Sequence, residues 1–284
     1  MAKSFTGALI GFLVADGRLV LDDPAPVPAW QRPGDPRGDI TLRHLLHMSS
    51  GLDHTEGPEE DGKTVFEADT NRMLFMDGAQ DTAAYAEARP MEAKPGEKFE
   101  YSSATSIILS DIITRTLTES TDPLVRRDVT LRFIRGRLLE PLGMDGTYPE
   151  FDQNGTFLGG SFLHATARDY ATFGEFLRHN GAKKGAQHLP VSWVRFMKKS
   201  SPNDPAYGGH IWLNNQRPEG RNTVLFPDNG PDTIFAALGH LGQQIVVSPE
   251  QQLTVVRLGK TQDDVLAPMR AQIGKIMALF PIRG

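Results

Sequence analysis

The sequence contains no cysteine among its 284 residues. This absence excludes disulfide bonds, thiolate metal sites and cysteine nucleophiles, but it leaves the compartment open, because cysteine-free proteins occur in reducing and oxidising compartments alike. No apolar run approaches the roughly 18–20 residues that a membrane-spanning helix needs. Basic residues are not in excess either: the net charge is −5 and the pI is 5.9, so the composition favours neither nucleic acid nor an anionic membrane as a partner.

The residues that are present describe a globular protein rich in loops. Apolar residues make up 39% of the chain and charged residues 23%, and the 28 glycines and 20 prolines imply many turns. The length allows one large domain or two closely packed ones. We find no internal repeat and no low-complexity segment.

The first nineteen residues, MAKSFTGALIGFLVADGRL, form a nearly apolar segment that predicts a helix ending near Asp16 and Arg18. The segment lacks the basic region and the cleavage site of a signal peptide, so the chain as it stands is expected in the cytoplasm. Its single lysine, Lys3, faces the positive end of the helix dipole, which is mildly unfavourable. Either its stem packs while its ammonium reaches water, or burial lowers its pKa and leaves a neutral amine that acts as a base.

The rest of the chain changes from helical to strand-like patterns near residue 206. Residues 20–40, 53–80 and 145–160 are expected to be loops, and the second of these is expected to be a surface excursion. Further helices are predicted over 41–50 (capped by Thr41 and stopped at Gly51), 81–89, 99–117, 124–139, 166–180 (capped by Thr166) and 264–280. Segments between 206 and 258 alternate like strands, with a hairpin at SPEQQ.

This order predicts an α+β fold in which helices flank an antiparallel sheet. We expect a sheet-containing domain from residues 1–20 and 206–284, and a mainly helical domain from residues 21–205. In the last helix, the spacing of the apolar residues predicts one buried face, formed by Val265, Met269, Ile273, Ile276 and Phe280.

Two further positions have side chains suited to chemistry. Tyr101 follows a Pro-Gly turn and precedes a helix, with Ser102 and Ser103 beside it. A phenol near a cation can be partly ionised and act as a base, although a packed tyrosine beside capping serines fits the same pattern. His240 lies between glycines in GHLG, where the backbone allows close approach of a ligand or simply forms a bulge.

A metal site is a third possibility. His44, His47 and His54 lie close in sequence, with Asp53 beside the last. The spacing matches no H-E-x-x-H or Cys/His pattern, so we expect neither a metal nor another cofactor.

Taken in order, several motifs resemble one family. They are MAKSFTGALIGFLVADGRL, ITLRHLLHMSSGL, KPGEKFEYSSATSIILSDII, LLEPLGMDGTY, GGSFLHATARDYATFGEFLRHNG, YGGHIWL and GHLGQQIVVSPEQQLTVV. The set is similar to the serine β-lactamase-related hydrolases, which include class C β-lactamases, D-peptidases and family VIII-type esterases. The resemblance is strongest to 6-aminohexanoate-dimer hydrolase-like proteins, and it covers nearly the whole chain.

The resemblance implies roles for particular residues. Met1-Ala2-Lys3 matches the last three positions of the family motif S-x-x-K, which would place the nucleophilic serine directly before Met1. Tyr101-Ser102-Ser103 matches Y-x-N with Ser103 in the asparagine position, and His240-Leu241-Gly242 matches the histidine form of the third motif. That histidine form points to an ester or amide hydrolase and away from a penicillin-specialised enzyme.

The implied reaction is acyl transfer through a covalent intermediate. Lys3 and Tyr101 would activate the serine and pass a proton to the leaving group, and His240 would bind a substrate carboxylate or support Tyr101. The backbone N–H of Gln243 and that of the serine would form the oxyanion hole, with Gly242 beside it. Family members also carry strands ahead of this helix, so we expect the chain to be a truncated form that leaves one sheet edge open.

These expectations leave alternatives in other classes. The chain is expected to act on a small amide or ester when complete, without nucleic-acid or membrane partners, and its oligomeric state cannot be predicted. The first alternative is a non-catalytic, ligand-binding protein that keeps the pocket and lacks the nucleophile. The second is a metal-dependent hydrolase, whose activity a chelator would abolish.

Overall fold

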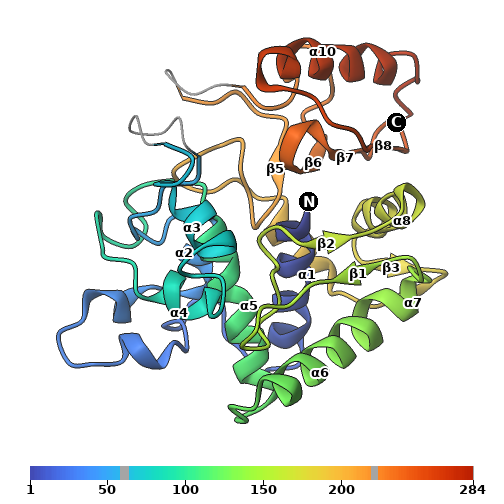
Figure 1. Ribbon diagram of the computed structural model, residues 1–284. Helices are drawn as coiled ribbons and strands as arrows, with labels where there is room; N and C mark the ends of the chain where they lie inside the picture. The colour runs from blue at the N-terminus through green and yellow to red at the C-terminus, as the bar shows by residue number, and fades with distance from the viewer. Residues whose placement is uncertain (58–63, 219–222, 284) are drawn as a thin grey trace.

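The computed structural model describes residues 1–57, 64–218 and 223–283, and its first helix lies at the centre of the molecule (Figure 1). Helix α1 spans Ala2–Ala15, and all its residues from Ala2 to Leu13 are buried. Phe5 stacks on Phe173, with ring centroids 3.7 Å apart. The ring of Trp193 lies directly over Gly11, where a Cβ would overlap it. The apolar composition of this helix therefore follows from burial on all sides.

A group of helices packs on one side of α1. The longest is α5 (Ser103–Leu117), which contacts α1, α2, α4 and α6. The predicted cap at Thr41 is present, and its hydroxyl accepts a hydrogen bond from the N–H of His44. Helix α5 begins at Ser103 and not at residue 99 as predicted, because the Ser102 hydroxyl caps it by accepting a hydrogen bond from the Thr105 N–H. The other elements of this part are η1 (Pro28–Trp30), η2 (Pro36–Asp39), α2 (Leu42–Leu46), α3 (Asp69–Phe75), α4 (Thr82–Glu87), α6 (Pro123–Ile134), the π-turn η4 (Arg135–Leu139) and α7 (Glu140–Leu142).

The C-terminal part contains a four-stranded antiparallel sheet in the order β5-β6-β7-β8. Its strands are β5 (Trp212–Leu213), β6 (Phe235–Leu238), β7 (Gln244–Ser248) and β8 (Leu253–Arg257). Strands β7 and β8 form the predicted hairpin, with Ser248 opposite Leu253. In this sheet β5 and β8 are the edge strands.

Helices cover both faces of this sheet. Ile245 and Val247 face α8 (Ala167–Arg178), where Gly174 allows close contact, while Ala236 and Val246 pack with α10 (Leu266–Met277). This alternation is expected of a sheet buried on both sides. The remaining elements are β1 (Tyr148–Pro149), β2 (Leu163–His164), β3 (Ala182–Lys183), β4 (Ala186–Gln187), α9 (Val191–Met197), η5 (His240–Gly242) and η6 (Asp263–Val265).

The predicted α+β class is confirmed, while several details of the prediction are wrong. The segment 53–80 is not only a surface excursion, because it contains α3 and buries His54 and Met73. Helix α9 was not predicted. In α10 the buried residues are Ile273, Gly274 and Met277. Of the predicted buried face, Val265, Ile276 and Phe280 are exposed (47, 41 and 44%), so that prediction is wrong for three of its five residues.

Two points of organisation remain. The division into a sheet domain (1–20 and 206–284) and a helical domain (21–205) stays a proposal, which the central position of α1 supports. Among the described helices none is long and apolar enough to cross a bilayer.

Candidate functional site

The ammonium group of Lys3 lies at the junction of three segments far apart in sequence. Lys3 is the second residue of α1 and is 7% exposed. Its Nζ donates hydrogen bonds to the Ser103 Oγ (2.8 Å) and to the Gly160 carbonyl oxygen (2.9 Å). The ammonium therefore does not reach water along its stem, and that interpretation of the sequence is wrong.

Tyr101 lies beside Lys3, as the sequence predicted. The Lys3 Nζ is 4.7 Å from the centroid of the phenol ring. The ring packs against Trp212 and Tyr207, with centroids 5.3 and 5.9 Å away. Ser102, the cap of α5, has an extended backbone, and Tyr101 directly before it lies against Lys3.

Glu56 belongs to the same cluster and was not predicted from the sequence. Its carboxylate accepts hydrogen bonds from the Ser103 N–H (2.6 Å), the Ser103 Oγ (2.7 Å) and the Thr70 Oγ1 (2.9 Å). One carboxylate oxygen lies 3.7 Å from the Lys3 Nζ. Glu56 lies in an aperiodic polar segment, so no sequence pattern indicated it.

The pKa directions at this cluster differ from those expected. Burial by itself lowers the pKa of Lys3, but the negative charges of ionised Tyr101 and of Glu56 outweigh it and raise that pKa above its ordinary value of 10.5. Burial raises the pKa of Tyr101 in spite of the lysine beside it. Burial also opposes ionisation of Glu56, yet Lys3 and the hydrogen bonds hold its pKa well below the usual range. The resting cluster thus carries an ammonium and a carboxylate, not a neutral amine.

The end of strand β6 lies beside the start of α1. The α-amino group of Met1 donates a hydrogen bond to the Leu238 carbonyl oxygen at 2.6 Å. A Cβ on Gly239 would lie 3.4 Å from the same nitrogen. The backbone nitrogen of Met1 is therefore held against the strand that leads into the GHLG segment.

The GHLG residues lie on a short turn between β6 and β7. His240 is exposed at this turn, and its expected contact with a substrate carboxylate or with Tyr101 stays a prediction. Gly242 has a φ of +78° and packs against Met269 and Leu266 of α10. The Gln243 N–H makes only a long bond of 3.5 Å to the His240 carbonyl, so its part in an oxyanion hole also stays a prediction.

The three histidines considered as metal ligands point to different surroundings. The Nδ1 of His44 accepts a hydrogen bond from the Thr41 N–H, His47 stacks on Phe196, and the Nε2 of His54 lies 2.8 Å from the Thr70 Oγ1. In the described part of the chain, no three His, Cys, Asp or Glu side chains converge as a metal site would require.

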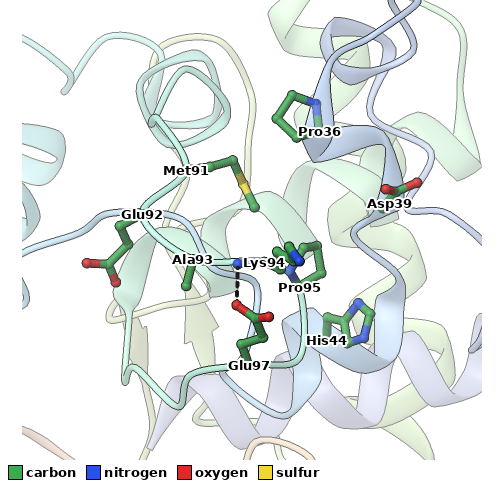
Figure 2. Close-up of a pocket in the computed structure, with 9 residues that line it drawn as sticks. All are labelled: Pro36, Asp39, His44, Met91, Glu92, Ala93, Lys94, Pro95 and Glu97. Carbon is green, nitrogen blue, oxygen red and sulfur yellow. Dashed lines mark hydrogen bonds between the residues drawn. The ribbon is translucent and has the colours of Figure 1, made fainter.

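His44 instead lines a separate cavity of about 740 Å³ (Figure 2). At its wall the Glu97 carboxylate accepts a hydrogen bond from the Lys94 backbone nitrogen at 3.2 Å. Lys3, Tyr101 and Glu56 do not line this cavity. The buried cluster of charged groups around Lys3 therefore lies outside this cavity.

The arrangement around Lys3 suits proton transfer. The Ser103 hydroxyl accepts a hydrogen bond from the Lys3 ammonium and donates one to the Glu56 carboxylate. The Tyr101 ring lies beside the same ammonium, and the pKa values of Lys3, Tyr101 and Glu56 depend on one another. A group placed next to the Met1 nitrogen would lie at the edge of this cluster and beside β6.

Comparisons with known proteins show the family and the fold of the chain. A family model described as Beta-lactamase matches residues 1–275. The fold is similar to that of a Bacillus anthracis protein assigned as a 6-aminohexanoate-dimer hydrolase, with a TM-score of 0.71 and 23% identity over 99% of this chain and 72% of that one.

Two other solved structures share the fold. An octameric penicillin-binding protein homologue from Pyrococcus abyssi has a TM-score of 0.63 and 22% identity, over 98% of this chain and 64% of that one. A D-stereospecific amidohydrolase from Streptomyces has a TM-score of 0.51 and 19% identity, over 87% of this chain and 72% of that one.

Proposed function

The chain belongs to the β-lactamase family, and on that premise we propose that it acts in an amide or ester hydrolase that works through an acyl-enzyme. The proposal places the nucleophilic serine directly before Met1 and assigns the acid–base work to Lys3 and Tyr101. The observation that carries it is the contact of Lys3 with both Tyr101 and Ser103, residues about 100 positions away.

The proton pathway follows from the coupled pKa values. Lys3 and Tyr101 act as one unit that, in its active form, lacks one proton. This unit takes the proton of the serine hydroxyl as the oxygen attacks the substrate carbonyl, and the C–O bond of the acyl-enzyme forms. It then returns the proton to the departing amine or alcohol as the amide C–N bond or the ester C–O bond of the substrate breaks. Water, deprotonated by the same unit, attacks the acyl-enzyme and releases the acid and the serine.

The contact between α1 and β6 supports the position of the oxyanion hole. The Met1 nitrogen donates a hydrogen bond to the Leu238 carbonyl oxygen, so a residue before Met1 would lie next to the turn that leads to Gln243. Backbone N–H groups from the serine and from Gln243 would then face the same carbonyl oxygen. Losing one such donor typically costs about 10²–10³ in rate.

The substrate class is a small amide or ester. This agrees with relatives named as a 6-aminohexanoate-dimer hydrolase and a D-stereospecific amidohydrolase. Tyr101 and Trp212 supply aromatic surface beside the ammonium, which suits a substrate with an apolar acyl part.

The test compares the chain as given with a chain extended upstream by its own codons. We expect a fluorophosphonate probe to label the extended chain, and a nitrophenyl ester to give a burst with it. Lys3→Met in the extended chain should reduce labelling at least about 100-fold. Lys275→Met, which removes an exposed lysine on α10, is the matched control and should label normally.

Two outcomes would contradict the proposal. Equal labelling of the chain as given would place the nucleophile inside it, with Ser102 and Ser103 beside Tyr101 as the candidates. Absence of labelling and of a burst in the extended chain would favour the non-catalytic, ligand-binding alternative.

A further inference from the structure

A chain of hydrogen bonds connects Lys3 to Glu56 through one hydroxyl group. The Lys3 ammonium donates to the Ser103 Oγ, so that hydroxyl is free to donate its own proton to the Glu56 carboxylate. The Ser103 N–H binds the second carboxylate oxygen. Ser103 is thus hydrogen-bonded to the Glu56 carboxylate through both its backbone N–H and its hydroxyl.

The same carboxylate is fixed from its other side. Thr70, on α3, donates its hydroxyl to Glu56 at 2.9 Å, and the Nε2 of His54 lies 3.4 Å from the same oxygen. Only 21% of the Glu56 side chain is exposed. A carboxylate that contacts four groups in a largely buried site has little conformational freedom. It therefore presents a negative charge to Lys3 from a fixed position.

We propose that Glu56 is a positioning residue that keeps Lys3 in its ammonium form and holds it against Tyr101 through the Ser103 hydroxyl. The inference rests on the proposed function in taking Lys3 and Tyr101 as the acid–base pair. It adds that the protonation of this pair is set by an acid from a different segment, which contacts Ser103 and Lys3.

Two further titratable groups, an amino group and an imidazole ring, face Lys3. The Met1 amino group and the His210 ring, which bonds to the Ser106 hydroxyl, are both electrostatically coupled to Lys3. Burial lowers the pKa of His210 to about 3, so this ring is neutral and does not oppose the ammonium. Among these described neighbours, Tyr101 holds a negative charge only after losing a proton, which leaves Glu56 as the permanent anion.

The test is an NMR titration of the Lys3 side chain in the full chain, with labelled lysine and assignment by Lys3→Arg. In the wild type, Lys3 should stay protonated to at least about pH 10. In Glu56→Gln, its midpoint should fall by about one to three pH units, because burial then acts without an opposing charge. Glu67→Gln, an exposed acid of the same segment, is the matched control and should leave Lys3 unchanged.

Two further variants keep the test decisive if Glu56→Gln does not fold. Glu56→Asp retains the charge and should keep Lys3 protonated. Ser103→Ala removes the connecting hydroxyl but not the charge, and should lower the midpoint by less than Glu56→Gln does. A Lys3 midpoint below about pH 9 in the wild type, or an equal midpoint with and without the carboxylate, would overturn the inference.

Activity in the extended chain separates this inference from the proposed function. If the extended chain is labelled, the limb of its pH profile that depends on Lys3 should shift to lower pH in Glu56→Gln by the same amount as the NMR midpoint. A profile that stays in place while labelling persists would overturn the positioning role. Failure of labelling in the wild type would instead count against the proposed function, since the titration of Lys3 does not depend on a nucleophile.

Discussion

Helix α5 takes part in two buried charge clusters that differ in how completely their groups are paired. The first, at Ser103, joins Lys3 to Glu56; the second, about 12 Å further along the helix, is centred on Asp111. Asp111 is fully buried, and its two oxygens pair with Arg126 and Arg115. In this second cluster the Asp111 carboxylate therefore has a partner of opposite charge at each oxygen.

In the first cluster, at Ser103, the hydrogen-bonding groups are less completely paired. The Lys3 ammonium has three N–H donors, and Ser103 and Gly160 take two of them, while Glu56 and Tyr101 lie near the third. An ammonium with a donor directed at a phenol can exchange a proton there, whereas a guanidinium with a pKa above about 12 cannot. The two clusters therefore differ in whether a cation could exchange a proton with its neighbour.

The largest expected effect on stability is in the second cluster. Asp111→Asn would leave Arg126 buried with only the Asn154 carbonyl and Thr156 as partners. We expect a loss of about 3–5 kcal/mol in the free energy of unfolding, measured by urea denaturation. Glu140→Gln, in an exposed pair, should leave the midpoint unchanged. A loss for Asp111→Asn as small as that of the control would show that the ion pairs of Asp111 do not stabilise the fold.

The next effect is a pH dependence at Glu87, a buried acid next to Asp111. Burial, followed by the charge of Asp111, raises the pKa of Glu87 from 4.5 to about 8. Because the folded-state pKa is the higher one, the stability that Glu87 contributes is complete below about pH 4.5 and is lost as the pH rises to about 8.

Glu87→Gln should therefore match the wild type near pH 4 and exceed it near pH 8 by at least about 1 kcal/mol. The measurement is the melting temperature against pH for both chains, with the exposed Glu119→Gln as control. Curves for Glu87→Gln and wild type that run parallel from pH 4 to pH 8 would rule out the ionisation of Glu87 as the cause.

The smallest effect on stability is expected in the first cluster. The double variant Lys3→Met/Glu56→Gln removes both charges of a buried pair and keeps the side-chain volumes similar. We expect its free energy of unfolding to stay within about 1 kcal/mol of the wild type, because the loss of the pair is offset by the lower cost of burial. A loss in the free energy of unfolding as large as that of Asp111→Asn would mean that the two clusters contribute equally to stability.

Much of the fold was predictable because local rules govern it. Thr41 and Thr166 cap helices where the sequence predicted them, since a side-chain acceptor beside the first N–H groups is a local feature. The β7–β8 hairpin was predictable from alternating residues and its Pro-containing turn. The exposed Ile276 was not, because the face that α10 buries depends on how the helix lies on the sheet.

The candidate site was predictable only in part. Lys3, Tyr101 and Ser103 were identified because their motifs resemble those of a family in the right order, and the structure brings these three together. Glu56 could not be identified, because a carboxylate in an aperiodic loop gives no signal until the chain folds. The predicted direction of the Lys3 pKa shift was wrong because burial was given too much weight. The charges of Tyr101 and Glu56 beside the ammonium outweigh burial, and their distances from it are set only by the fold.

The sequence by itself determined most of the helices, the hairpin, the absence of thiol chemistry and the family to which the chain belongs, because these depend on residue type and on short or ordered patterns. Only the tertiary structure decided which acid faces Lys3, that the ammonium is charged and not neutral, and that β6 meets the start of α1. These properties depend on groups up to 237 residues apart in the chain, as with Met1 and Leu238, and Coulomb energies and desolvation depend on distance in space and not on distance in sequence.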